Sequence, residues 1–504
     1  MLQALELIRS RELGGVDFGR MMNGINSILI RLVYNDTPVR LPAMDLPQTF
    51  GYTRIIREAE NGVYVRPQDN SADFFEYILP FLAINNNSSS VTLSEALSDL
   101  AKAAELRPNS VLPPFFRGSI HERAGRFAEA EASYRQAYGI SDECYPALAG
   151  VARIYRRNGR TAEALAIFSD MVIRYPDSLF IKKQLALTHY ENRNWPAAGP
   201  VVDEILRQEP RDGEFLLMKA HILIEQGSYS AAQAPLDTYA SINSNNRLYL
   251  FLRARVQAEG SRNRDSALNY LRSILRTNPD DQEALIYASG LLMESQRPAD
   301  QTEGRELLDR LRRISGSSLD VLSLSLRDAV RRENWQEAQG FLNTILASRR
   351  TVQDLSDAYL VERGLGNNSR ALTFARELYN KDTSNNEYTA IFISALIDNA
   401  RMDEASRLIE SRLSASAGNA SAMSGLYFLR SRTRANEEAA LGDLRSSLFE
   451  DPRNLQALIA TFEIYHRRRE ERRAVYYLKQ ALAIAPDNPR LKRYEAEYSS
   501  LLGR

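Results

Sequence analysis

The sequence predicts an all-α protein, a solenoid of antiparallel helix pairs. Three observations support this prediction. Similar residues recur at intervals that are often 34 residues long. Each interval holds two amphipathic segments, with apolar residues at helical spacing. Gly or a polar cluster separates the two segments, and Pro, which does not continue a helix, often ends the interval.

The period is clearest in the stretch NGRTAEALAIFSDMVIRYPDS (158–178), where Gly159, Ala164, Phe168 and Pro176 mark four positions. The intervals on either side fill the same positions with Gly125, Ala130, Tyr134 and Asp142, with Arg193, Ala198, Val202 and Pro210, and with Gly227, Ala232, Leu236 and Ser244. Five repeats in register begin near Tyr77, Val111, Tyr145, Leu179 and Gly213.

The middle of each first segment carries a small residue. These residues are Gly118, Ala152, Ala186, Ala220 and Ala254. A larger side chain there would hold two helix axes apart, so we expect close contacts between helices at these positions. The Ala near the start of each second segment has the same explanation.

The pattern continues more loosely after residue 244. One extra residue is needed within GSRNRDS (260–266) and about three within SQRPADQTEG (295–304). Degenerate copies follow around Trp335, Gly366, Ala405 and Ala440, and the last repeat is again clear. We predict about twelve repeats over residues 77–488, followed by a C-terminal capping helix over 489–504, whose outer face is polar as an array end requires.

This pattern resembles the tetratricopeptide repeat (TPR), a 34-residue helix pair with small and aromatic residues at fixed positions. The resemblance is specific from about residue 77 to residue 244. It implies a right-handed superhelix whose first helices line a concave groove, the surface on which ligands of the family usually bind. Pro200 and Pro235, which lie inside second helices, depart from the pattern and should each remove one backbone hydrogen bond.

Residues 1–76 fit the repeat poorly and are predicted to form a separate helical segment. Two β-favourable runs flank Asn61-Gly62, a dipeptide suited to a tight turn. They predict a short β-hairpin over residues 52–66; an irregular loop that packs over the first repeat is the alternative.

The composition narrows the class of protein. The 64 basic and 64 acidic residues cancel, whereas a general nucleic-acid binder usually carries a basic excess. No apolar run is long enough for a transmembrane helix. No signal peptide is recognised, yet the chain opens inside an apparent amphipathic helix, so both the cytoplasm and the cell envelope, reached with a leader outside this chain, stay open.

The residues offer no catalytic or metal-binding constellation. Cys144 is the single cysteine, and none of the four histidines, His121, His189, His221 and His466, forms a metal-binding pair at helical spacing. No phosphate-binding Gly-rich loop and no nucleophile elbow occur. We therefore expect a protein that is not an enzyme and holds no cofactor and no metal.

The expected groove carries a pattern of charge. A basic patch is followed by acidic residues at the same place in four adjacent repeats, and we expect these carboxylates to repel one another. The proposed partner-binding residues are Arg123, Arg153, Arg156, Arg157, Lys183, Glu191, Glu225, Glu259 and Glu294. The Lys, Asn and Arg set with which some TPR modules grip a C-terminal carboxylate is missing, since Ala149, Leu217 and Ile286 occupy its places.

The favoured function is a non-enzymatic scaffold or adaptor. It would bind protein or peptide segments along the groove and help assemble a multiprotein complex. The alternatives are an accessory or regulatory module of an enzyme complex and a helical-repeat RNA-binding protein. The RNA-binding alternative requires basic and aromatic residues in a regular code, which the acidic residues oppose. The sequence leaves the oligomeric state open.

Overall fold

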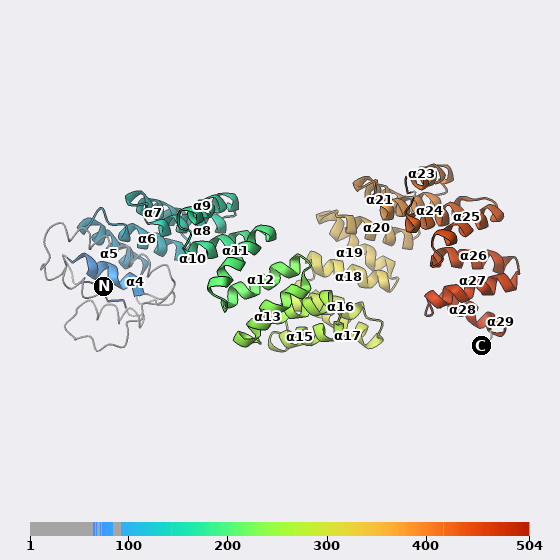
Figure 1. The fold of residues 1–504 in the computed structure, drawn as a ribbon, viewed down its shortest axis with the longest axis horizontal. Helices are drawn as coiled ribbons and strands as arrows, with labels where there is room; N and C mark the ends of the chain where they lie inside the picture. Colours follow the sequence, from blue (N-terminus) through green and yellow to red (C-terminus); the bar gives the residue numbers. More distant parts are fainter. Residues whose placement is uncertain are drawn as a thin grey trace. The chain divides into compact units, whose positions relative to one another are not determined.

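The computed structural model describes residues 64–65, 67, 71, 73–83, 92–142, 144–416 and 418–502. All regular elements of these residues are helices (Figure 1). The chain divides into two units, residues 1–270 and 271–504. The hairpin predicted over 52–66 lies outside the described residues, apart from Tyr64 and Val65, which belong to no helix or strand. Of the N-terminal segment predicted over 1–76, the structure describes residues 64–65, 67, 71 and 73–76, and α4 begins within it at Phe74.

The first unit stacks helix pairs in chain order, and each second helix also packs against the next first helix. Its pairs are α4 (Phe74–Ala83) with α5 (Leu93–Leu106), α6 (Leu112–Arg123) with α7 (Phe127–Ile140), α8 (Tyr145–Arg157) with α9 (Thr161–Arg174), α10 (Leu179–Glu191) with α11 (Trp195–Gln208), and α12 (Gly213–Glu225) with α13 (Tyr229–Asn243). Next come α14 (Arg247–Arg255) and a π-helix, η1 (Val256–Gly260). The helix α15 (Arg264–Thr277) spans the division between the units.

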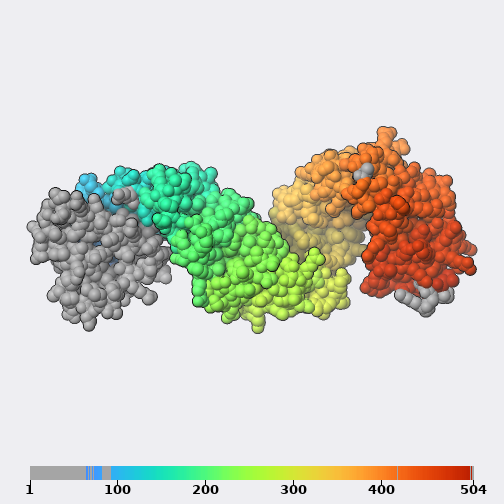
Figure 2. All heavy atoms as spheres, viewed as in Figure 1, coloured from blue at the N-terminus to red at the C-terminus, as the bar shows by residue number. Residues whose placement is uncertain are grey.

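The second unit repeats the same arrangement. Its pairs are α16 (Gln282–Met293) with α17 (Pro298–Ser315), α18 (Leu319–Arg331) with α19 (Trp335–Ser348), α20 (Val352–Gly364) with α21 (Asn368–Lys381), α22 (Asn386–Asp398) with α23 (Met402–Ala415), α24 (Ala420–Thr433) with α25 (Glu437–Glu450), and α26 (Leu455–Arg467) with α27 (Glu471–Ile484). The short helices α28 (Pro489–Glu497) and α29 (Ser499–Leu502) follow. Successive pairs of each unit are in direct contact in the space-filling view (Figure 2).

The helix-pair repeat fold predicted from the period is therefore confirmed within each unit. The limits proposed for the array, residues 77 and 488, and the capping segment 489–504 stay predictions. The helices α11 and α13 continue through Pro200 and Pro235.

The turn inside each helix pair explains the recurring Gly. Gly125, Gly159 and Gly227 have φ values of 72°, 75° and 72°, and Arg193 has a φ of 54° at the same position. This left-handed backbone conformation is the one that glycine adopts most easily. The same conformation ends the first helix of other pairs at Arg262, Glu333, Gly366, Ala400 and Arg469.

The small residue Gly118 makes the close contact expected of it. The buried ring of Tyr134, on α7, lies between Gly118 of α6 and Gly150 of α8. A Cβ atom added at either glycine would lie 2.6 Å from a ring carbon of Tyr134. The aromatic position of one repeat therefore depends on two glycines in neighbouring first helices.

The sequence predicts one extra residue within 260–266. The structure accommodates it in η1, over Val256–Gly260, directly after α14. Gly227 and Arg262, which hold equivalent turn positions, are 35 residues apart, and the π-helix η1 lies between them. A π-helix contains one more residue per turn than an α-helix, so η1 accommodates the additional residue. Its last residue, Gly260, approaches α13 so closely that a Cβ atom there would lie 2.5 Å from the Cβ of Tyr229.

Candidate functional site

The proposed binding residues lie on the first helices of their pairs or directly after them. In the first unit they belong to α6 (Arg123), α8 (Arg153, Arg156, Arg157), α10 (Lys183, Glu191), α12 (Glu225) and η1 (Glu259). Glu294 follows α16 in the second unit, where its side chain is exposed and has no ion partner among the described residues. The candidate surface is therefore built from the first-helix residues of the first unit alone.

Glu122, which the sequence analysis missed, organises the basic end of this surface. Its side chain is only 8% exposed and accepts a hydrogen bond from Tyr134 Oη at 2.8 Å. Arg153 Nη2 lies 2.9 Å from its Oε2, and Arg157 Nη1 lies 3.8 Å from its Oε1. Burial opposes ionisation of Glu122, but the charge and hydrogen bonds of Arg153 prevail and lower its pKa below the ordinary value.

The next contact joins α8 to α10. Arg156 Nε lies 3.1 Å from Glu191 Oε2, and Arg156 Nη1 also donates to Gln184 and Thr188 at 3.3 and 3.4 Å. Burial lowers the pKa of Arg156, whose side chain is 13% exposed, but an arginine remains charged at neutral pH. Arg156 and Glu191 thus neutralise one another between two repeats.

Arg255 forms ion pairs with two acidic residues at the other end of the surface. Its Nη1 lies 2.5 Å from Glu225 Oε1, and its Nε lies 2.9 Å from Glu259 Oε1. His221 Nε2 also lies 3.4 Å from Glu225 Oε1, and the other ring nitrogen of His221 contacts the hydroxyl of Tyr190. The hydrogen bond from Arg255 is the main reason that the pKa of Glu225 is lowered.

Lys183 is held by the connection between α11 and α12. Its Nζ lies 2.6 Å from Glu209 Oε2 and 2.7 Å from Asp212 Oδ2. Burial opposes its charge, but the hydrogen bonds of the two carboxylates raise the pKa of Lys183. This lysine therefore serves a contact between repeats.

The expectation that the acidic residues only repel one another is wrong for the first unit. Glu191 and Glu225 pair with arginines of neighbouring first helices, Arg156 and Arg255, and Glu259 pairs with Arg255 four residues before it. Arg123 differs, since it is exposed and has no ion partner among the described residues. Arg157 is 54% exposed, and its one ion contact within the described part of the chain is that with Glu122 at 3.8 Å.

Cys144 and His121 are buried. Burial raises the pKa of the Cys144 thiol to about 11, so it is protonated at neutral pH. His121 is buried, and burial lowers its pKa. Within the described ranges, no group of His, Cys, Asp and Glu is arranged to hold a metal ion. None of the helices described is both long and apolar enough to cross a bilayer.

The fold and the turn geometry define a helix-pair repeat protein. Family models described as tetratricopeptide repeat match residues 93–147, 122–182 and 183–246. Residues 93–246 therefore match tetratricopeptide repeats, and the chain contains a protein-interaction repeat module.

The comparison with solved structures finds matches of low identity and low TM-score. PilF of Pseudomonas aeruginosa is 21% identical, with a TM-score of 0.35 over 39% of this chain and 88% of that chain. Yeast Tom70 is 12% identical, with a TM-score of 0.38 over 82% and 92%. A tetratricopeptide repeat protein from Parabacteroides merdae is 14% identical, with a TM-score of 0.35 over 57% and 98%. The comparison with curated proteins finds no match.

Proposed function

We propose that this protein is a non-enzymatic scaffold that binds protein segments along the first helices of its first unit and helps assemble a multiprotein complex. The family supports a protein or peptide ligand. The observation that carries the proposal is the sign of the charge at the two ends of this surface, where ion pairs between repeats do not balance all the charged side chains.

The two ends of the surface keep opposite charge. At α6 and α8, Arg153 and Arg157 share the carboxylate of Glu122, and Arg123 is exposed, so basic side chains predominate at this end. At α12 and η1, the guanidinium of Arg255 contacts both Glu225 and Glu259, so carboxylates outnumber guanidinium groups in this contact. A partner segment with an acidic part and a basic part, in this order from α6 to η1, fits this surface.

Such charges act mainly on encounter and partner choice. Exposed ion pairs contribute only about 0–1 kcal/mol each, and salt weakens them. Complementary charge at the edge of an interface speeds association and excludes wrong partners. We therefore expect the affinity of the partner to fall as salt is added.

Arg123 and Arg207 provide a matched test. Both are exposed arginines without an ion partner among the described residues, but Arg123 lies on the first helix α6 and Arg207 on the second helix α11. The full chain would capture binding proteins from its native source, and binding of each purified protein would then be measured. We expect Arg123→Glu to weaken binding several-fold at low salt and Arg207→Glu to leave it unchanged.

Equal binding by the wild-type chain and Arg123→Glu at low salt would exclude the charged first-helix surface as the site. Arg153 is unsuitable for this test, although it was among the predicted binding residues. A carboxylate at position 153 would face the buried Glu122, so a loss of binding would report damaged packing between α6 and α8.

A further inference from the structure

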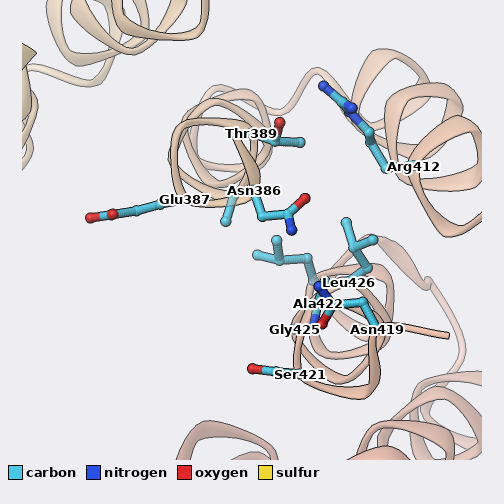
Figure 3. Close-up of a pocket in the computed structure, with 11 residues that line it drawn as sticks. Asn386, Glu387, Thr389, Arg412, Asn419, Ser421, Ala422, Gly425 and Leu426 are labelled. Atoms are coloured by element: carbon cyan, nitrogen blue, oxygen red, sulfur yellow. Dashed lines mark hydrogen bonds between the residues drawn. The ribbon is translucent and has the colours of Figure 1, made fainter. Parts of the chain in front are cut away.

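A pocket of about 360 Å³ opens between three helices of the second unit. Its walls come from α22, α23 and α24 (Figure 3). Asn386 and Leu426 point into the space between α22 and α24, and Arg412 forms the wall on the side of α23. Part of the lining is apolar, from Ala422, Gly425 and Leu429. None of these residues belongs to the surface proposed above.

Small side chains create this space. A Cβ atom added at Gly425 would meet no heavy atom within 4 Å beyond its own helix backbone. Ala390 and Ala422, on the facing helices, also project little into the pocket. Leu426 and Leu429 are buried and supply an apolar floor. The space can therefore take a ligand group without displacing any side chain of the core.

The guanidinium of Arg412 lies over the ring of Tyr379. It lies 5.9 Å from the ring centre of Tyr379, which stacks on Phe392 at 5.1 Å. Arg376 lies 5.8 Å from the ring centre of Phe392. Stacking fixes the plane of a guanidinium and leaves its N–H groups for a ligand. Among the described residues, no carboxylate forms an ion pair with Arg412.

The other polar groups of the pocket add donors. The side-chain amide of Asn386 has no hydrogen-bond partner among the described residues. Asn419 uses Oδ1 to cap α24, which leaves its Nδ2 as a donor. The carboxylate of Glu387 points away from the pocket in Figure 3. Asp382 accepts two hydrogen bonds from Ser384 on Oδ1. These hydrogen bonds are the main reason that the pKa of Asp382 is lowered, and Arg412 contributes least.

We propose that this pocket binds the carboxylate side chain of a glutamate carried by an extended peptide segment. Arg412, Asn386 and Asn419 would donate to the carboxylate oxygens, and Leu426 and Leu429 would pack against the methylene groups. The apolar floor favours a carboxylate on a short carbon chain over inorganic phosphate, which has no apolar part. This site does not depend on the function proposed for the first unit.

The test uses the full chain with isotope-labelled leucine methyl groups. The methyl signals of Leu426 and Leu429 are followed by NMR during titration with N-acetylglutamate α-amide. The matched neutral probe is N-acetylglutamine α-amide, and inorganic phosphate is the third probe. We expect saturable shifts with the glutamate probe only.

Three variants locate the binding. Arg412→Gln should weaken binding of the glutamate probe roughly tenfold or more, since a hydrogen bond to a charged group is lost. Gly425→Leu should abolish binding, because the new side chain fills the pocket, and an unchanged circular dichroism spectrum would show that the fold is kept. Arg407→Gln, on the exposed face of the same helix α23, should bind the probe like the wild-type chain.

The proposal is overturned if the glutamate probe causes no saturable shift at tens of millimolar, or if glutamine binds equally well. It is also overturned if phosphate binds more tightly than glutamate, which would indicate a general anion site. Equal affinity of Arg412→Gln and the wild-type chain would exclude the proposed role of Arg412.

Discussion

Gly118 and Gly425 each lie in the middle of a first helix, one in each unit, but their surroundings are opposite. The ring of Tyr134 fills the space beside Gly118, whereas the space beside Gly425 is open. In the first unit, glycine permits the closest approach of an aromatic ring, and a buried ion cluster at Glu122 completes the contact. In the second unit, glycine leaves a hollow. The same residue type therefore marks a tight contact in one unit and a pocket in the other.

The largest effect is expected from introducing the same side chain at both glycines. Gly118→Leu should destabilise the region around α6–α8 by about 3 kcal/mol or more, because the side chain would collide with the ring of Tyr134. Gly425→Leu should change the stability around α24 by less than about 1 kcal/mol. Hydrogen exchange of the amides in these helices would measure the free energy of local opening. Equal losses in the two variants would remove the distinction between contact and pocket.

The next prediction concerns the ion cluster that accompanies the tight contact. Glu122→Gln should destabilise α6–α8 by about 2 kcal/mol, since Arg153 loses its charged partner in a buried setting. Glu214→Gln, at an exposed position of α12 with no ion partner among the described residues, is the control and should have almost no effect. The same hydrogen-exchange measurement applies. A loss at Glu122 no larger than at Glu214 would show that the cluster contributes nothing.

The pH dependence of this cluster has a defined sign. The pKa of Glu122 is below its ordinary value of 4.5, so its carboxylate contributes stability above that value and the contribution is lost as the pH falls towards its folded pKa. The free energy of opening around α6–α8 should therefore decrease as the pH is lowered from about 5 to about 3. In Glu122→Gln this part of the decrease should vanish. An identical pH profile in both proteins would assign the acid sensitivity to other groups.

The smallest effect is expected at the turns. Three of the first four left-handed turn residues are Gly125, Gly159 and Gly227, whereas the second unit has Ala400 in this conformation. Ala400→Gly should stabilise its helix pair by up to about 1 kcal/mol, and Gly125→Ala should destabilise its pair by about 1 kcal/mol. No atom lies within 4 Å of a Cβ added at Gly125, so conformation alone should decide the result. Thermal unfolding would detect both shifts; equal signs would contradict this explanation.

The sequence predicted the features that a period makes visible. The turn position at Gly159 and the small residue at Gly118 recur at fixed spacing, and the structure confirms both. The residue before many of the first helices is a further repeating signal in the sequence. Residues that cap the first helices recur at similar intervals through the degenerate region, where the aromatic positions had weakened. They are Ser178, Asp212, Asn246, Asp281, Thr351, Asn385, Asn419, Asn454 and Asn488.

The charged partners were harder to predict. Glu122 meets Arg153, and Arg156 meets Glu191, across separations of 31 and 35 residues. These partners lie one repeat apart, but the sign of each charge changes from repeat to repeat, so no constant position reveals them. The pocket near Gly425 was also missed, because a period records which positions are small and not whether a neighbouring side chain fills the space.

The π-helix η1 has a consequence for how such a chain can change in length. A single inserted residue within an α-helix would rotate every later side chain by about 100° and turn the apolar face away from its neighbours. In η1 the insertion is confined to residues 256–260, and Ala267 is buried as Ala232 is in the preceding repeat. The end of a first helix is therefore a place where evolution can add one residue to a repeat without changing the phase of the repeats that follow.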